Sequence, residues 1–222
     1  MLKAFRILSD STATLALSAL IIAVFFISPD ISLGGDWHAT ASEPWRLAAY
    51  SLLHNRAQHL VINLALLLSF GSRYETRTSA LSLLVVFTAG GIIGGTLFAA
   101  ASAASGNTSV TLCGSSAAVI AVMCACQTDR HSGFSIWGLS PFFVPILLTL
   151  DSIMGLFGSN TGGSLAHIGG IIAGVAAGLL ANRPSTGSNH PGHIIGKAER
   201  SGYSSLTGEE RDILFNQNST EK

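Results

Sequence analysis

The chain has 222 residues, of which 48% are hydrophobic and only 11% are charged, and its mean hydropathy is +0.49. Soluble domains carry about 25% charged residues, so this composition indicates an integral membrane protein. The 12 basic and 12 acidic residues cancel, so charge gives no reason to expect a nucleic-acid partner. Cys113, Cys124 and Cys126 form neither a disulfide framework nor the spacing of a zinc site, and we expect no metal and no cofactor.

The first predicted element is a transmembrane helix over residues 12–27, after a cytoplasmic amphipathic lead of residues 1–11. A basic start followed by an apolar run is also typical of a signal peptide. However, the run is long, and no A-x-A cleavage site precedes the break at Pro29. We therefore interpret it as the first membrane span.

The second predicted helix covers about residues 47–70, after a polar loop that contains Trp37 and Trp45. Its outer half carries six polar side chains: His54, Asn55, Arg56, Gln58, His59 and Asn63. Polar groups at that depth usually face the interior of a helix bundle or a water-filled cavity. His59 and Asn63 are four residues apart, so they project from one helix face toward a common point.

The region between Thr78 and Thr128 contains no charged residue and is long enough for two spans. The third helix is predicted over residues 80–101, with two overlapping G-x-x-x-G pairs that allow close helix contact. The fourth begins at Ser115 or Ser116, after Gly114, and ends near residue 126 unless the next two residues extend it. Ser115 can cap the free backbone N–H groups of this helix.

Ser116 would then lie in the first turn of the fourth helix. The positive end of the helix dipole and the free N–H groups would stabilise an oxyanion beside it. The Gly-x-Ser pattern alone is a weak signal, because it recurs at residues 133–135 and 138–140 and a small-residue helix face also explains it.

The fifth helix is predicted over residues 141–157 and the sixth over residues 164–181. We assign no catalytic role to Asp151, the acidic residue of the fifth helix. The sixth helix contains His167 and a ridge of small residues on which another helix can lie at short distance: Gly170, Gly174 and Gly178.

The polar segment of residues 182–222 is expected to be a largely disordered cytoplasmic tail, with a turn or two of amphipathic helix at residues 206–215. The predicted fold is thus an all-α membrane bundle of six helices over residues 12–181.

Basic residues gather in the segments that this topology places on the inner side: Lys3, Arg6, Arg73, Arg77, Arg130, Arg183, Lys197 and Arg200. The pattern predicts that both termini are cytoplasmic. The second, fourth and sixth helices then run from outside to inside. His59, Asn63, Ser116 and His167 consequently share one depth, in the outer half of the membrane, which favours a single site.

A serine hydroxyl is a poor nucleophile until a base removes its proton, and neutral His167 can do so. The glycine ridge would hold His167 within about 3 Å of Ser116, the distance that proton transfer needs. His59, Asn63 and the Ser116 backbone N–H would donate to the oxyanion. Two alternatives stay open: His59 and Asn63 bond to each other or to loop carbonyls, and His54 is structural.

The chain resembles rhomboid intramembrane serine proteases over residues 45–180. Four motifs carry the resemblance: Glu43-x-Trp45-Arg46, His54-x4-His59-x3-Asn63, Gly114-x-Ser116 and Ala166-His167-x-x-Gly170. The resemblance implies the six-helix core of bacterial members, with Ser116 as nucleophile, His167 as base, and His59, Asn63 and Gly114 in the oxyanion site. Trp45 and Arg46 would order the outer loop, and His54, Gly170 and Gly174 would give structural support.

The same resemblance implies a multi-pass protein of the bacterial inner membrane whose active site opens to the periplasmic side. Its substrate would be a single-span or C-terminally anchored membrane protein, cut near the outer end of the span. The short chain and the Glu-Pro-Trp-Arg start are also similar to rhombosortases. Two positions depart from the family pattern, because Ala117 replaces the usual glycine and Ile120 replaces an aromatic residue.

A catalytically inactive rhomboid-like protein, which binds membrane helices for quality control, is the main alternative. Such proteins typically lack the serine or the histidine, and both are present here. A channel or transporter would need a polar path across the whole membrane, whereas the polar residues here gather in the outer half.

Overall fold

The structure, a computed structural model, describes residues 7, 10–27, 31–34, 37–107, 109–128, 161–181 and 191–217. The chain divides into two compact units, residues 1–182 and 183–222. The first unit contains α2 (Thr12–Ile27), β1 (Leu33–Gly34), α3 (Trp37–Ser42), α4 (Arg46–Ala49), η1 (Tyr50–Leu52), α5 (Ala57–Leu66), η2 (Leu67–Gly71), α6 (Ser72–Arg77), α7 (Ala80–Ser105), β2 (Thr111–Leu112), α8 (Ser116–Thr128) and α10 (Thr161–Ala181). The predicted fifth helix and Asp151 lie outside the described residues.

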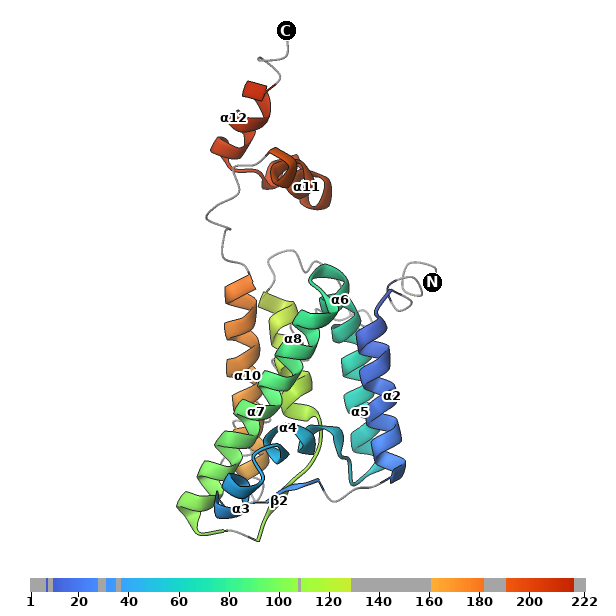
Figure 1. The fold of residues 1–222 in the computed structure, drawn as a ribbon, viewed down its shortest axis with the longest axis vertical. Helices are drawn as coiled ribbons and strands as arrows, with labels where there is room; N and C mark the ends of the chain where they lie inside the picture. Colours follow the sequence, from blue (N-terminus) through green and yellow to red (C-terminus); the bar gives the residue numbers. More distant parts are fainter. Residues whose placement is uncertain are drawn as a thin grey trace. The chain divides into compact units, whose positions relative to one another are not determined.

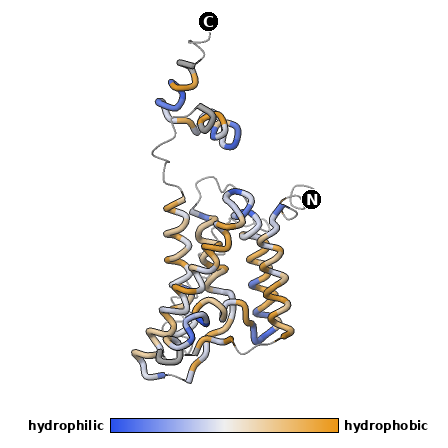
Figure 2. Tube along the Cα trace, in the orientation of Figure 1, coloured by the Kyte–Doolittle hydropathy of each residue, from blue (hydrophilic) through white to orange (hydrophobic). Residues whose placement is uncertain are grey.

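Helices dominate the described residues, as the sequence predicts (Figure 1). α7 and most of α10 are long and apolar enough to cross a bilayer, while α2 and α8 are shorter apolar helices. In Figure 2, where the Cα trace is coloured by hydropathy, hydrophobic positions recur along these helices. The count of six spans and the cytoplasmic termini stay predictions.

The predicted second span is not one continuous helix from residue 47. η1 ends at Leu52, and the next residue, Leu53, has an extended backbone (φ −86°, ψ 143°). α5 begins only after the extended Arg56 (φ −137°, ψ 134°). His54 therefore enters the bundle from an irregular segment. The position of His54 relative to His59 and Asn63 is therefore not set by helical spacing.

A π-helical segment, η2, joins α5 to α6 without a break in the helical backbone. Its i→i+5 hydrogen bonding widens the helix locally and shifts the faces presented above and below it. Gly71 ends this segment against α2, where an added Cβ would lie 3.3 Å from the Thr14 side chain. Asn63 and Glu75 consequently lie on either side of the π-helical segment.

The N-terminus of α2 is held by the buried carboxylate of Glu75 from α6. Glu75 accepts hydrogen bonds from the backbone N–H groups of Ala13 and Thr14, both at 2.8 Å, and from the Thr14 hydroxyl at 2.7 Å. The first N–H groups of a helix lack partners within the helix and carry the positive end of its dipole. Glu75 therefore satisfies and neutralises this helix end.

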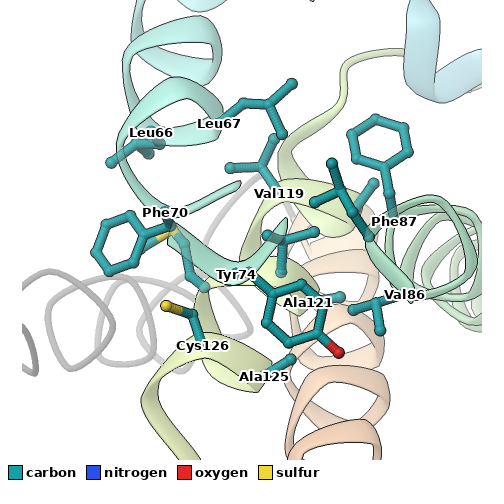
Figure 3. Packing of buried hydrophobic residues seen from close by; sticks show 14 of the residues in the cluster. Leu66, Leu67, Phe70, Tyr74, Val86, Phe87, Val119, Ala121, Ala125 and Cys126 are labelled. Carbon is teal, nitrogen blue, oxygen red and sulfur yellow. The ribbon is translucent and has the colours of Figure 1, made fainter. Parts of the chain in front are cut away.

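The main hydrophobic core lies where α8 packs against the α5–η2–α6 helix and α7 (Figure 3). Its side chains include Leu66, Leu67, Phe70, Tyr74, Val86, Phe87, Val119, Ala121, Ala125 and Cys126. α8 is buried along almost its whole length, because residues Ala117 to Gln127 are all buried. α8, which begins at Ser116, is thus held in place by contacts with α7, α10 and η2.

α7, α8 and α10 lie side by side and meet through glycines (Figure 1). An added Cβ at Gly170 would overlap the Ala117 carbonyl, and one at Gly174 would overlap the Ala121 carbonyl. A Cβ at Gly94 would lie 2.7 Å from the Ala166 carbonyl oxygen. Backbone therefore packs directly against backbone in this three-helix contact.

The second unit has helices where the sequence analysis expects a largely disordered tail. It contains α11 (Pro191–Ser201), η3 (Tyr203–Ser205) and α12 (Gly208–Gln217). Lys197 forms a salt bridge to Glu210 at 2.6 Å, and the Thr207 N–H donates to Glu210 while the Thr207 hydroxyl accepts from the Glu210 N–H. This capping box starts α12, and the buried Ile194 and Leu206 give the unit a small core.

Candidate active site

Gly114 makes the turn from β2 into α8. Its φ of +119° is a conformation that side chains with a Cβ rarely adopt, and its N–H donates to the Tyr50 carbonyl at 3.2 Å. An added Cβ would overlap the His59 ring. Only glycine therefore lets the chain turn here while His59 lies against it.

The substitution Gly114→Ala is expected to damage the site more than the fold. The unusual φ alone costs about 1–3 kcal/mol for a residue with a Cβ. The new methyl group would also displace His59. Gly106→Ala is the matched control, because Gly106 has a φ of +68° with nothing within 4 Å of an added Cβ. We expect both variants to melt at lower temperature, but only Gly114→Ala to lose covalent labelling by a serine-directed probe.

Ser116 and His167 come from separate helices and meet at one point. The Ser116 Oγ lies 2.9 Å from the His167 Nε2. Ser116 is the first residue of α8, and His167 lies in the first two turns of α10, one turn before the Gly170 contact with Ala117. The glycine contact therefore brings the Ser116 Oγ and the His167 Nε2 within hydrogen-bond distance.

A cavity of about 140 Å³ opens beside this pair. It is lined by His59, Ile62, Asn63, Leu66, Ser116, Val119, Ile120 and His167. The four polar residues that the sequence places at one depth thus line one cavity. Ile120 forms an apolar part of the cavity wall. It is the residue that replaces an aromatic side chain of the pattern described above.

His54, His59 and Asn63 form one polar group beside the cavity. The Asn63 Nδ2 donates to the His59 carbonyl at 2.9 Å and lies 3.3 Å from the His54 Nε2. The His54 and His59 rings pack edge to face with their centroids 5.1 Å apart. His54 is buried, so it supports the cavity wall instead of lining the cavity.

Ser115 has a contact that the sequence analysis missed. Its hydroxyl lies 3.2 Å from the His54 Nε2, so it reaches across to the segment before α5. From the sequence, we predict only that Ser115 caps the fourth helix. The signal for this contact is a second hydroxyl directly before Ser116.

Arg46 links α4 to the segments that precede it. It forms a salt bridge to Glu43 at 2.7 Å, donates to the Ser32 carbonyl at 3.1 Å, and lies 4.8 Å from the centroid of the half-exposed Trp45 ring. The neighbouring Leu33 pairs with Leu112 between β1 and β2, just before the turn at Gly114. These contacts connect the segment that contains Ser32 and Leu33 to the start of α8.

No three His, Cys, Asp or Glu side chains converge as a metal site within the described part of the chain. The polar groups that line the cavity are the hydroxyl of Ser116, the imidazoles of His59 and His167, and the amide of Asn63. A hydroxyl next to an imidazole, with amide and imidazole groups across a small cavity, can carry out nucleophilic acyl transfer.

Comparison with family models matches the Rhomboid domain to residues 41–184 of this chain, which is more than half of its length. The matched range contains every residue that lines the cavity. A search of curated proteins found no match.

Proposed function

Because the chain belongs to the rhomboid family, we propose that it is an intramembrane serine endopeptidase that hydrolyses a peptide bond near the outer end of a substrate's transmembrane helix. The observation that carries this proposal is the distance of 2.9 Å between the Ser116 Oγ and the His167 Nε2. Rhomboid-like proteins without activity typically lack one of these two groups.

In the proposed reaction, the Ser116 Oγ attacks the carbonyl carbon of the substrate while its proton passes to the His167 Nε2. The oxyanion that forms is stabilised by the Ser116 backbone N–H together with His59 and Asn63. The C–N bond then breaks, and His167 protonates the leaving amine. Water, deprotonated by His167, hydrolyses the acyl-enzyme and restores Ser116.

The proposed setting is a bundle of six spans in the bacterial inner membrane, with both termini in the cytoplasm and the active site opening to the periplasm. The basic residues of the inner segments support this orientation. The substrate is a single-span or C-terminally anchored membrane protein whose helix unwinds locally. Unwinding is needed because the carbonyl and N–H groups of an intact helix are paired and shielded.

Covalent labelling with a fluorophosphonate probe tests the proposal, because such a probe reacts with an activated serine. The Ser116 Oγ–phosphorus bond forms, the phosphorus–fluorine bond breaks, and the proton passes to His167. Peptide mass spectrometry should find the adduct on Ser116 and not on Ser115. The neighbouring hydroxyl is thus an internal control for activation.

Labelling of Ser115, or of neither serine in folded protein, would contradict the proposed activity. The second result would instead support the inactive, helix-binding alternative. A pull-down with single-span membrane proteins would then test that alternative directly.

A further inference from the structure

Three buried polar side chains meet at one nitrogen atom behind the cavity. Ser115 is 0% exposed, His54 1% and Asn63 3%. The His54 Nε2 lies 3.2 Å from the Ser115 Oγ, 3.4 Å from the Ser115 backbone N and 3.3 Å from the Asn63 Nδ2. Because all three side chains are buried, water does not compete strongly for their hydrogen bonds. The contacts among them therefore decide which groups pair.

The amide group of Asn63 has two hydrogens, and both have partners in this arrangement. One is donated to the His59 carbonyl at 2.9 Å, and the other faces the His54 Nε2 at 3.3 Å. An asparagine amide can donate only two hydrogen bonds. Asn63 can therefore donate to an oxyanion only if one of these contacts is released.

The His54 Nε2 acts as an acceptor, because the backbone N–H of Ser115 donates to it. A neutral imidazole nitrogen of this kind has a single lone pair. The Asn63 amide, the Ser115 N–H and the Ser115 hydroxyl therefore compete for it. The Ser115 Oγ is the nearest of the three donors.

We infer that Ser115 is a positioning residue, whose hydroxyl donates to the His54 Nε2 and thereby releases one amide hydrogen of Asn63 for the oxyanion. Without the hydroxyl, the Asn63 amide at 3.3 Å is nearer to the His54 Nε2 than the Ser115 backbone N at 3.4 Å, so the Asn63 hydrogen stays on His54. The inference rests on the proposed function and adds a role for the residue before the nucleophile. Ser115 acts through His54 and Asn63, and it does not touch the reacting atoms itself.

The rate constant for fluorophosphonate labelling measures this effect, because the phosphoryl oxygen of the probe takes the place of the oxyanion. Ser115→Ala removes one neutral hydrogen bond and should slow labelling about tenfold. Asn63→Ala removes an oxyanion donor and should slow it about 100-fold. The double variant should label at the rate of Asn63→Ala alone, because Ser115 acts only through Asn63.

Ser18→Ala is the matched control, because it removes another buried hydroxyl, which bonds to the Thr14 carbonyl within α2 at 2.8 Å. This variant should label at the wild-type rate. If Ser115→Ala does not fold, Ser115→Cys keeps the side-chain size with a weaker donor. It should label more slowly than wild type in the presence of Asn63 and should have no effect beside Asn63→Ala.

A wild-type labelling rate for Ser115→Ala would overturn the inference. An equal tenfold loss from Ser115→Ala with and without Asn63→Ala would also overturn it, because Ser115 would then act independently of Asn63. Both results leave labelling of the wild-type Ser116 intact and so leave the proposed function standing. Absence of labelling in the wild type overturns the proposed function and the inference together.

Discussion

Ser116→Ala and His167→Ala are each expected to abolish cleavage of a single-span reporter protein. Removing one member of a serine–histidine pair costs about 10⁶-fold in rate, because the nucleophile and its base act as a unit. The Ser116 Oγ and the His167 Nε2 are already within hydrogen-bond distance at 2.9 Å. For the same reason, the double variant should be no slower than either single variant.

The measurement is the amount of cleaved reporter after incubation in lipid vesicles, with the cut site located by mass spectrometry. Ser115→Ala is the matched control, because it removes the adjacent hydroxyl and should slow the reaction only about tenfold. Substantial cleavage by Ser116→Ala would show that another group performs the chemistry.

Glu75→Ala is expected to cause the largest loss of stability. The substitution removes three hydrogen bonds to a buried carboxylate and leaves the N-terminus of α2 unpaired. Hydrogen bonds to charged groups contribute about 1.5–3 kcal/mol each. Water that enters the space left by the Glu75 side chain replaces some of these bonds, so the net loss is smaller than their sum. We expect the free energy of unfolding to fall by about 3 kcal/mol, measured by denaturant titration in detergent.

Two further variants separate the causes. Glu75→Gln keeps the shape and one acceptor oxygen but loses the charge, so it should cost less than Glu75→Ala. Glu209→Ala removes an exposed carboxylate in the second unit and should change little. Equal stability of Glu75→Ala and Glu209→Ala would mean that the cap on α2 contributes nothing.

The meeting of the α8 and α10 helices could be predicted from sequence because it depends on spacing. Gly170 and Gly174 repeat every four residues and so share one helix face, and the structure places them against Ala117 and Ala121. The predicted topology also leads us to expect His59, Asn63, Ser116 and His167 at a single site, and the structure places all four around one cavity. These patterns depend only on helix period and span length.

Other features depend on contacts that no local pattern reveals. The break before α5 lies between Leu53 and Arg56, in a polar run where no proline or glycine signals it. The bond between Ser115 and His54 joins residues 61 positions apart. α11 and α12 hold together through the Lys197–Glu210 pair, which composition alone does not predict.

The glycine contacts between α8 and α10 also affect how robust the Ser116–His167 pair is. Glycine and alanine have no side-chain rotamers to lose, so bringing these helices together costs no side-chain conformational entropy at the contact. The geometry therefore does not depend on freezing long, mobile side chains, which become more expensive to order as temperature rises. The reacting pair should stay aligned when the lipid composition changes or detergent replaces the bilayer.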